Sequence, residues 1–272
     1  MGTDSDWQAW GERDPYFGVL TQERFRYENL TPGSFDEFFR MGREEASQVL
    51  ADCRRHVGEV STRCTLDFGC GVGRMLIPFS QISEMCVGVD ISQAMRAEAA
   101  RNCSKFNCRN VQLVSSLEEA RKKQETFTFV HSYIVLQHIN PQRGLGILAG
   151  LLASLEKGGC AALQVTYAHS KHRDNFGAPP FSRRLMRRIR RPFSLLSRRI
   201  RGSEPKMQMN TYDMNRVLFL AQAFGVRTGG FSFTNHYGHL GMILYLKRDG
   251  DVGARGNPSD EDTGARPEKG PT

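Results

Sequence analysis

The residue types best suited to binding chemistry lie at positions 65–74, in the run Thr-Leu-Asp-Phe-Gly-Cys-Gly-Val-Gly-Arg. A short apolar strand leads into Asp67, and glycines then occupy alternate positions at Gly69, Gly71 and Gly73. Glycines spaced in this way allow a tight turn and let a ligand lie against the backbone. A helix that begins after the turn would point its free amide groups at the same ligand. The run therefore predicts a loop that binds a nucleotide-type cofactor.

The spacing of these glycines argues against a dinucleotide. A dinucleotide loop has the pattern Gly-x-Gly-x-x-Gly, in which the third glycine lets the helix and the strand pack closely. Counting from Gly69 puts Arg74 at the third position, and counting from Gly71 puts Leu76 there. Neither residue is glycine, so an NAD(P) site is disfavoured.

The pattern Asp-x-Gly-x-Gly-x-Gly at 67–73 resembles motif I of the class I S-adenosylmethionine (SAM) methyltransferases. A second short strand is predicted at 85–91, and the acid near its end, Asp90, can accept hydrogen bonds from both ribose hydroxyls. Ile91 and Met95 can form an apolar slot for an adenine ring. The string Val-Asp-Ile-Ser-x-x-Met is similar to the segment that follows motif I in this family.

The resemblance extends to two further predicted strands. After the run 111–114, residues of the family line the adenine edge, although a serine stands here where an acid is common. After the run 126–132, the resemblance places the chain near the methionine part of the cofactor, and His138 is expected to be satisfied by backbone. The resemblance implies SAM as cofactor, no metal ion, and a cofactor site of Asp67, Gly69, Cys70, Gly71, Gly73, Asp90, Ile91, Met95, Ser116, Leu117 and Ser132.

Predicted strands alternate with helices along the chain, which indicates a parallel βαβ sheet. The resemblance implies a Rossmann-like α/β fold with seven strands, mostly parallel, in the order 3-2-1-4-5-7-6. Helices are predicted from a Ser-x-x-Glu capping box at Ser34 and from a cap at Thr211. The expected organisation is an aromatic-rich cap segment at 1–33, a methyltransferase domain at 34–248 with a basic insert at 171–206, and a disordered tail at 249–272.

The composition is that of an ordinary globular protein, with 39% hydrophobic and 24% charged residues. No run approaches the roughly 20 apolar residues that span a bilayer, and the first residues lack the apolar core of a secretory signal. The seven cysteines are scattered without a Cys-x-x-Cys pair, which favours reduced thiols over disulfides or a metal site. These features predict a cytoplasmic protein. Its positive charge would also allow peripheral contact with a membrane.

The net charge of +8 is concentrated in one segment. Residues 171–206 hold twelve basic and two acidic residues, a balance of +10 that leaves −2 for the rest of the chain. Apolar residues recur there at helical spacing. A basic amphipathic stretch suits an anionic membrane, the phosphate or carboxylate groups of a substrate, or nucleic acid. Nucleic acid is disfavoured because the only aromatic residues between 181 and 201 are Phe181 and Phe193.

Ligands of a parallel sheet bind beyond the carboxyl ends of its strands. In the implied strand order, this places the basic insert and a predicted loop at 234–239 beside the transferred methyl group. His236 and His239 in that loop are candidate general bases, because imidazole titrates near neutral pH.

These features favour O-methylation of a small polar or anionic acceptor, such as a sugar or glycolipid intermediate. Residues 183–201 would then contact an anionic membrane peripherally. N-methylation, including that of RNA, is an alternative, although no Asn-Pro-Pro-Tyr motif follows the fourth predicted strand. A non-catalytic, SAM-binding regulatory domain is the second alternative.

Overall fold

The computed structural model describes residues 3–178 and 204–250. The expectations for the arginine-rich stretch 183–201, and for the predicted tail from residue 251 onward, concern parts of the chain outside the described residues. No helix within the described ranges is long and apolar enough to cross a bilayer.

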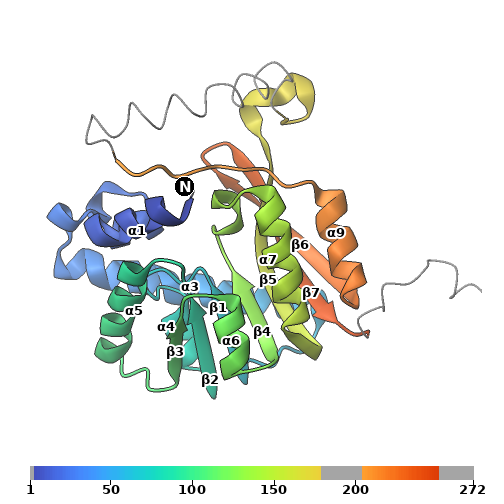
Figure 1. The fold of residues 1–272 in the computed structure, drawn as a ribbon, viewed down its shortest axis with the longest axis horizontal. Coiled ribbons are helices and arrows are strands. Elements are labelled where there is room, and N and C mark those ends of the chain that lie inside the picture. The colour runs from blue at the N-terminus through green and yellow to red at the C-terminus, as the bar shows by residue number, and fades with distance from the viewer. Residues whose placement is uncertain (1–2, 179–203, 251–272) are drawn as a thin grey trace, which may run out of the picture.

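A seven-stranded sheet in the order β3-β2-β1-β4-β5-β7-β6 organises the described fold (Figure 1). Strands β1 to β5 pair in parallel, whereas β7 runs antiparallel to both of its neighbours. The predicted Rossmann-like α/β class and the predicted strand order are confirmed. The strands are β1 Cys64–Phe68, β2 Met85–Val89, β3 Val111–Val114, β4 Phe127–Ser132, β5 Leu155–His169, β6 Val226–His236 and β7 His239–Arg248.

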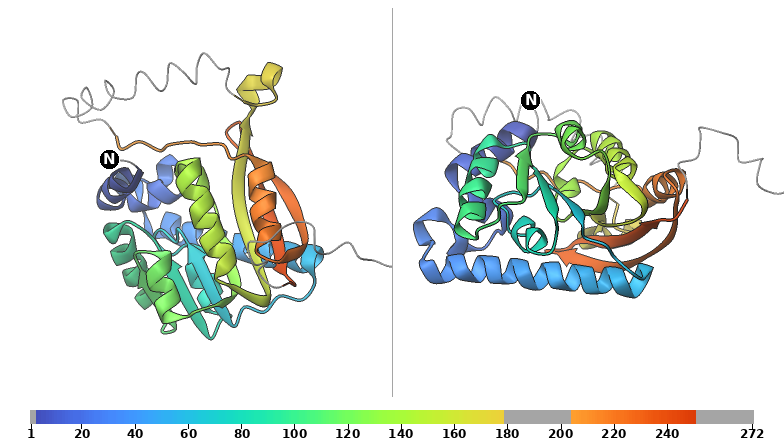
Figure 2. Two further views of the ribbon diagram at one scale, coloured as in Figure 1. Left: turned by 45° about the vertical axis from the view of Figure 1, so that its right-hand side comes forward. Right: turned by 90° about the horizontal axis from the view of Figure 1, so that it is seen from below.

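Helices cover both faces of the sheet, and the long helix α3 runs along one of them (Figure 2). Residues of α3, α4 and α5 share one apolar core, and residues of α6, α7 and α9 share the other. Strand β4 is buried at every position because both faces are covered, as is usual for a central parallel strand. The helices are α1 Thr3–Arg13, α2 Pro15–Val19, α3 Pro32–Val57, α4 Leu76–Ser80, α5 Gln93–Lys105, α6 Leu117–Lys123, α7 Pro141–Ala153 and α9 Met214–Ala223, with short 3-10 turns η1 Glu23–Phe25, η2 Tyr27–Asn29, η3 Leu136–His138 and η4 Ser170–Asn175.

Two predicted helix starts are wrong by a few residues. Helix α3 is capped by Thr31, whose hydroxyl accepts from the Ser34 amide at 3.2 Å while the Ser34 hydroxyl accepts from the Thr31 amide at 2.9 Å. Pro32 at the first helical position suits this earlier start, because it has no amide hydrogen to satisfy. Helix α9 is capped by Asp213, which accepts from the Asn215 amide at 3.0 Å, and not by Thr211.

The predicted loop at 234–239 is a tight hairpin instead. Strand β6 ends at His236 and strand β7 begins at His239, so only Tyr237 and Gly238 form the turn. Both turn residues have positive φ, 52° and 86°, as two-residue hairpins that match the strand twist require. The two histidines are therefore strand-end residues in direct register with each other.

The N-terminal helix and the segment 204–212 lie at the carboxyl end of the parallel strands (Figure 1). The segment is tied to α1 where the Lys206 amide donates to the Asp6 carboxylate at 3.1 Å. It is tied to η3 where the Asn210 amide donates to the Gln137 carbonyl at 2.7 Å. Both segments therefore help to enclose the end of the sheet at which ligands of this architecture bind.

Candidate cofactor pocket and the polar residues beside it

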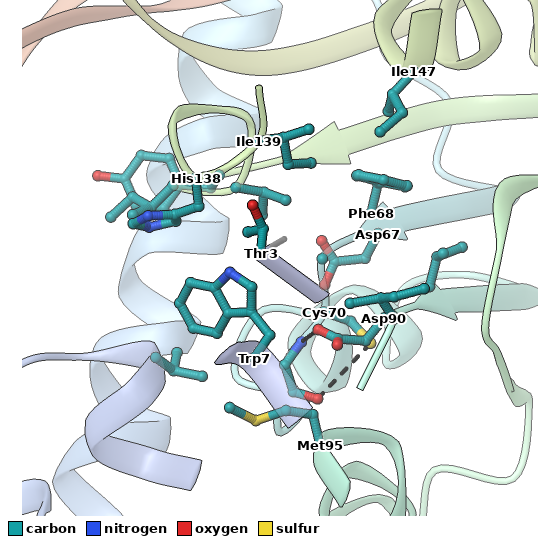
Figure 3. A pocket seen from close by; sticks show the side chains of 18 of the residues that line it. Thr3, Trp7, Asp67, Phe68, Cys70, Asp90, Met95, His138, Ile139 and Ile147 are labelled. Atoms are coloured by element: carbon teal, nitrogen blue, oxygen red, sulfur yellow. Dashed lines mark hydrogen bonds between the residues drawn. The ribbon is translucent and has the colours of Figure 1, made fainter. Parts of the chain in front are cut away.

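A cavity of about 270 Å³ lies beyond the carboxyl ends of β1, β2 and β4 (Figure 3). Helix α1 contributes to its wall, and Trp7 and His138 lie on one side of it while Asp67 and Asp90 lie on the other. Two predicted cofactor residues, Gly73 and Ser132, are not among those that line it. The structure brings the other nine together there: Asp67, Gly69, Cys70, Gly71, Asp90, Ile91, Met95, Ser116 and Leu117.

The glycine-rich loop needs its glycines for conformation and for space. Gly69 has a φ of 78°, and a Cβ at this position would lie 2.2 Å from a methyl carbon of Val135. Gly71 has a φ of 52°, and its Cβ would lie 2.7 Å from a methyl carbon of Val19. Side chains at either position would be strained and would push on the neighbouring walls of the cavity. The loop therefore presents bare backbone to the cavity.

Asp90 holds the loop to the end of β2. Its carboxylate accepts from the Gly71 amide at 3.0 Å and from the Ser92 amide at 2.9 Å. Burial raises the pKa of Asp90 to about 6, and the two backbone hydrogen bonds partly oppose that rise. The carboxylate has lone pairs left for further donors, because each oxygen accepts one of these bonds.

Asp67 forms a buried pair with His131, which the sequence analysis did not single out. His131 Nδ1 donates to Asp67 Oδ1 at 2.7 Å, and the two residues lie side by side because β1 and β4 pair at this register. Both side chains are almost fully buried, and Asp67 Oδ2 has no hydrogen-bond partner. The pairing depends on strand register, which single-strand patterns do not reveal.

Arg74 is a second residue that lines the pocket without being predicted from the sequence pattern. Its guanidinium is buried and forms an ion pair with Glu45 of α3, with Nη2 and Oε2 2.6 Å apart. Its Nε and Nη1 have no hydrogen-bond partner. A buried cation with unused donors can bind an anionic group of a ligand.

Ser132 and Gly73 support the pocket from outside its lining. The Ser132 hydroxyl donates to the Phe68 carbonyl at 3.0 Å and so joins the ends of β4 and β1. Gly73 has a φ of 90°, and its carbonyl accepts from the Ile77 amide at 3.0 Å, where α4 begins. Their positions fit a supporting role next to the cofactor loop.

Helix α1 is anchored over the pocket by side chains from its polar face. Gln8 Oε1 accepts from the Gln93 amide at 2.8 Å at the start of α5. Asp4 pairs with Arg143 of α7 at 2.6 Å, so the helix is held from both sides. Trp7 lies between these anchors, with its ring centre 4.9 Å from that of His138.

His138 is satisfied by backbone, as expected, but it also lines the cavity. Its Nδ1 donates to the Gln208 carbonyl at 2.7 Å, and burial lowers its pKa to about 4. The ring is therefore neutral at pH 7, with Nε2 as an acceptor, and the Gln137 side-chain amide approaches it at 3.4 Å. The hydrogen bond to segment 204–212 fixes this tautomer.

A chain of hydrogen bonds continues from η3 onto β5. Gln137 Oε1 accepts from the Thr166 hydroxyl at 2.8 Å, and the Gln164 side-chain amide approaches that hydroxyl at 3.3 Å. Gln164 is fully buried, and its Oε1 has no partner. Thr234 Oγ1 on β6 is also unpaired. A Cβ on Gly241 would lie 2.8 Å from Thr234 Oγ1 and 2.9 Å from Gln164 Nε2, so the two side chains lie close to the same glycine.

The two histidines at the hairpin point to different neighbours. The His236 ring lies 5.9 Å from the ring of Tyr133, which lines the cavity, and its Nε2 is buried without a partner. The His239 ring lies 4.3 Å from that of His169, at the tip of β5. Burial lowers the pKa of both His236 and His239. His236 is therefore the one of the pair that lies beside a residue of the cavity wall.

Comparisons with known proteins agree with this fold. The family model described as a methyltransferase domain matches residues 65–159. No curated protein matches the chain. The magnesium protoporphyrin IX methyltransferase ChlM of Synechocystis PCC 6803, solved with bound SAM, is similar over 91% of this chain and 98% of its own, at 16% identity and a TM-score of 0.53. An O-methyltransferase family protein of Burkholderia thailandensis is similar over 91% of this chain and 69% of its own, at 11% identity and a TM-score of 0.51.

Proposed function

We propose which residues of this chain bind the cofactor and what kind of acceptor it methylates. The chain is an S-adenosylmethionine-dependent methyltransferase with the class I fold. The proposed reaction is O-methylation of a small polar acceptor that carries several hydroxyl groups, as a sugar does. The proposed organisation keeps residues 1–33 as a cap on a methyltransferase domain at 34–248, and Trp7 in the cavity wall supports that division.

The cavity described above is the proposed cofactor site. Asp90 would accept the ribose hydroxyls, because its carboxylate retains free lone pairs after binding two backbone amides. Ile91, Met95, Ser116 and Leu117 would surround the adenine, and the remaining predicted residues would contact or support the methionine end: Asp67, Gly69, Cys70, Gly71, Gly73 and Ser132. When bound, SAM supplies an electrophilic methyl group on a sulfonium centre. The bare backbone of the loop and the unpaired buried groups Asp67 Oδ2 and Arg74 Nε fit such a charged, polar ligand.

The observation that supports a hydroxylated acceptor is a set of three unpaired polar atoms on strands whose carboxyl-end side chains include His236, the neighbour of Tyr133 in the cavity wall. They are Gln164 Oε1, Thr234 Oγ1 and His236 Nε2, on strands β5 and β6. Each buried polar group without a partner costs about 1–3 kcal/mol, so a ligand that supplies hydrogen bonds would recover that free energy. Hydroxyl groups both donate and accept, and therefore suit a mixed set of this kind.

The hydrogen-bond chain that starts at His138 leaves an acceptor atom at Gln164, which a hydrogen-bond donor on the substrate can satisfy. The Gln208 carbonyl can only accept, which makes His138 Nδ1 the donor and Nε2 the acceptor. Gln137 must then donate to Nε2, receive the Thr166 hydroxyl hydrogen on Oε1, and leave Thr166 to accept from Gln164. The chain ends at Gln164 Oε1, an acceptor that a substrate hydroxyl can satisfy.

His236 is the proposed general base, and His239 the second candidate. Burial lowers the pKa of His236, so the ring is neutral near pH 7 and able to take a proton. His236 Nε2 would take the proton of the acceptor hydroxyl as its oxygen bonds to the methyl carbon and the carbon–sulfur bond breaks. A positioned base of this kind contributes about 10²–10⁴-fold in rate.

We further propose a cytoplasmic protein that contacts anionic membrane peripherally, with an anionic group on the acceptor. This part rests on the sequence of 183–201, which lies outside the described residues, and on the net charge of +10 over 171–206. Flotation of the full chain with liposomes tests it. Binding to vesicles that contain anionic lipid, and not to neutral vesicles, is expected, and equal absence of binding to both would contradict the membrane contact.

Methyl transfer from radiolabelled SAM tests the acceptor class. The full chain would be incubated with separate pools of sugars and glycolipids, amines, and RNA, and the labelled product would be identified by mass spectrometry. Label on oxygen of a hydroxylated small molecule is expected. Label confined to amine nitrogen or to RNA would contradict the proposal, and the alternative of N-methylation would replace it.

A further inference from the structure

Three histidines form one row at the end of the sheet where β5 and β6 finish. His239 on β7 is paired directly with His169 on β5 and with His236 on β6. Directly opposed residues of antiparallel strands lie on the same face of a sheet. These three residues, the histidine row, therefore have their imidazoles on one face, and the ring centres of His169 and His239 are 4.3 Å apart.

The histidine row lies on the same face as two of the side chains proposed to bind the acceptor. Gly241 is two residues along β7 from His239, so the two positions share a face. A Cβ on Gly241 would lie 2.8 Å from Thr234 Oγ1 and 2.9 Å from Gln164 Nε2. Two residues of a strand span about 7 Å. An acceptor with a hydroxyl group at Thr234 or Gln164 would therefore reach the row with a group about 7 Å further along.

His169 is held in one orientation by its neighbours. Its Nδ1 accepts from the Lys171 amide at 3.3 Å, which leaves Nε2 as the N–H donor of the neutral ring. Gly238 of the hairpin turn packs against the ring, because a Cβ there would lie 3.1 Å from His169 Cε1. The Ser170 amide donates to the Gly238 carbonyl at 2.8 Å and ties the start of η4 to the hairpin. The direction of the donor is therefore set before a ligand binds.

The charges that act on His169 and His239 are positive. Burial lowers the pKa of His169, and Lys171 and His172 lower it further. Burial also lowers the pKa of His239, and Lys171 and the other two histidines of the row add to that effect. Both rings are therefore neutral at pH 7 and lie close to a lysine ammonium.

Two acids on neighbouring elements are poor partners for this charge. Asp174, the one acid of η4, is exposed to solvent. Glu45 on α3 opposes the effect of burial on the pKa of His236, and it is already paired with Arg74. An anionic group of a ligand would accept hydrogen bonds from the lysine and the imidazole N–H groups together. Such a group therefore suits the part of the row next to η4.

We propose that His169, His239 and Lys171 bind a phosphate group of the methyl acceptor. The inference rests on the proposed function and deepens it, because it adds an anion subsite about 7 Å from the side chains that would bind the hydroxyl group. The oxygens of a phosphate can accept from several N–H donors at once. A soluble phosphorylated molecule and a lipid headgroup would both supply this group.

Histidine NMR titrations of the full chain test the subsite. Protein labelled with carbon-13 histidine is titrated with acid in sodium phosphate and in sodium chloride of equal ionic strength, both with EDTA to remove metal ions. A bound phosphate places negative charge beside the imidazoles, so the pKa values of His169 and His239 should rise by about one pH unit relative to chloride. His56, which packs against Gly230 further along β6, is the internal control and should not change.

Variants of two residues show whether the proposed donors bind the anion. His169→Gln and Lys171→Gln should each weaken phosphate binding by about 3- to 10-fold, because each removes one hydrogen-bond donor. Lys123→Gln removes the same charge from an exposed position on α6 and should leave binding unchanged. The phosphate concentration that produces half of the shift in the His239 signal measures the affinity.

Competition identifies the source of the phosphate. Displacement of inorganic phosphate by glucose 6-phosphate would support a soluble phosphorylated acceptor. Displacement only by vesicles that contain phosphatidic acid, and not by phosphatidylcholine vesicles, would support a lipid headgroup.

Equal pKa values of His169 and His239 in phosphate and in chloride would overturn the inference. A rise of the same size at His56, or equal phosphate affinities of Lys171→Gln and Lys123→Gln, would overturn it as well. These titrations need neither SAM nor methyl transfer. Methyl label found only on amine nitrogen or on RNA would therefore contradict the proposed reaction without deciding the phosphate subsite, which the titrations decide separately.

Discussion

The proposed cofactor side and the proposed acceptor side of the site are built in different ways. On the cofactor side, a continuous stretch from Asp67 to Gly71 supplies a turn whose backbone faces the cavity, and Asp90 at the end of the next strand secures it. On the acceptor side, the polar atoms come from η3, β5 and β6, and a hydrogen-bond chain that starts at Gln208 orients those of η3 and β5. The first side depends on local backbone conformation, and the second on the pairing of distant strands. This difference explains why the chain reveals its methyl donor more readily than its acceptor.

Replacing His236 by glutamine should give the largest difference between the two sides, because it should reduce catalysis and leave cofactor binding intact. Loss of the proposed base should lower kcat by about 10²–10⁴-fold, because an unassisted hydroxyl is a poor nucleophile. The affinity for S-adenosylhomocysteine (SAH) should be unchanged, since His236 does not line the cofactor cavity. His239→Gln is the comparison, with an expected effect below about tenfold, because its ring packs on His169. Single-turnover methyl transfer measures both variants, and equal rates in the two would break the assignment.

Gly69→Ala should damage the cofactor side alone. The added methyl group would meet Val135 at 2.2 Å in a backbone conformation that costs L-residues about 1–3 kcal/mol, so SAH affinity should fall by about 5- to 150-fold. Gly146→Ala in α7 is the control, because a Cβ there meets nothing within 4 Å and should stabilise the helix by about 0.5–1 kcal/mol. Calorimetry gives the affinities and thermal unfolding gives the stabilities. Normal SAH binding by Gly69→Ala would show that the loop does not hold the cofactor.

The pH dependence of cofactor binding should identify Asp90. Because burial raises the pKa of Asp90 to about 6, its carboxyl takes up a proton as the pH falls below that value and loses acceptor capacity for the ribose hydroxyls. SAH affinity should therefore decline from pH 7 to pH 5 in the unchanged protein. Asp90→Asn should bind SAH about 10- to 100-fold more weakly at pH 7, with a flatter profile. A profile of the same slope in both proteins would assign the titration to another group.

Trp7→Ala should have the smallest effect and should sharpen the role of α1. Trp7 lines the cavity and packs on His138, and the loss of one such aromatic contact is worth about 0.5–1.5 kcal/mol, so SAH should bind about 3- to 10-fold more weakly. The change should appear mainly in the dissociation rate, which stopped-flow fluorescence can follow. An unchanged dissociation rate would mean that α1 does not close over the bound cofactor.

The parts of the site that the sequence predicted are those encoded within a few residues. The glycines at 69 and 71 and the acid at the end of β2 follow from local conformation, and all three line the cavity at the carboxyl end of the sheet. The strand order came from the resemblance to a family and not from the residues themselves. Local patterns also misplaced two helix caps, because several polar residues near each start could serve as a cap.

The parts that the sequence did not predict depend on contacts between distant segments. His131 reaches Asp67 because β1 and β4 pair in one register, and Glu45 reaches Arg74 because α3 crosses the loop. The run Thr-Asn-His-Tyr-Gly-His reads as a loop, yet its outer residues extend two strands. That extension gives His236 and His239 different neighbours, which their spacing alone does not distinguish.

A crystal structure of the full chain with SAH tests the division of the site most directly. We expect the ribose hydroxyls to lie within hydrogen-bond distance of the Asp90 carboxylate. We expect the sulfur to lie at the end of the cavity lined by Tyr133 and His138, facing the unpaired atoms of Gln164, Thr234 and His236. SAH bound with its sulfur turned away from these three residues, or without contact to Asp90, would contradict the proposed division of the site.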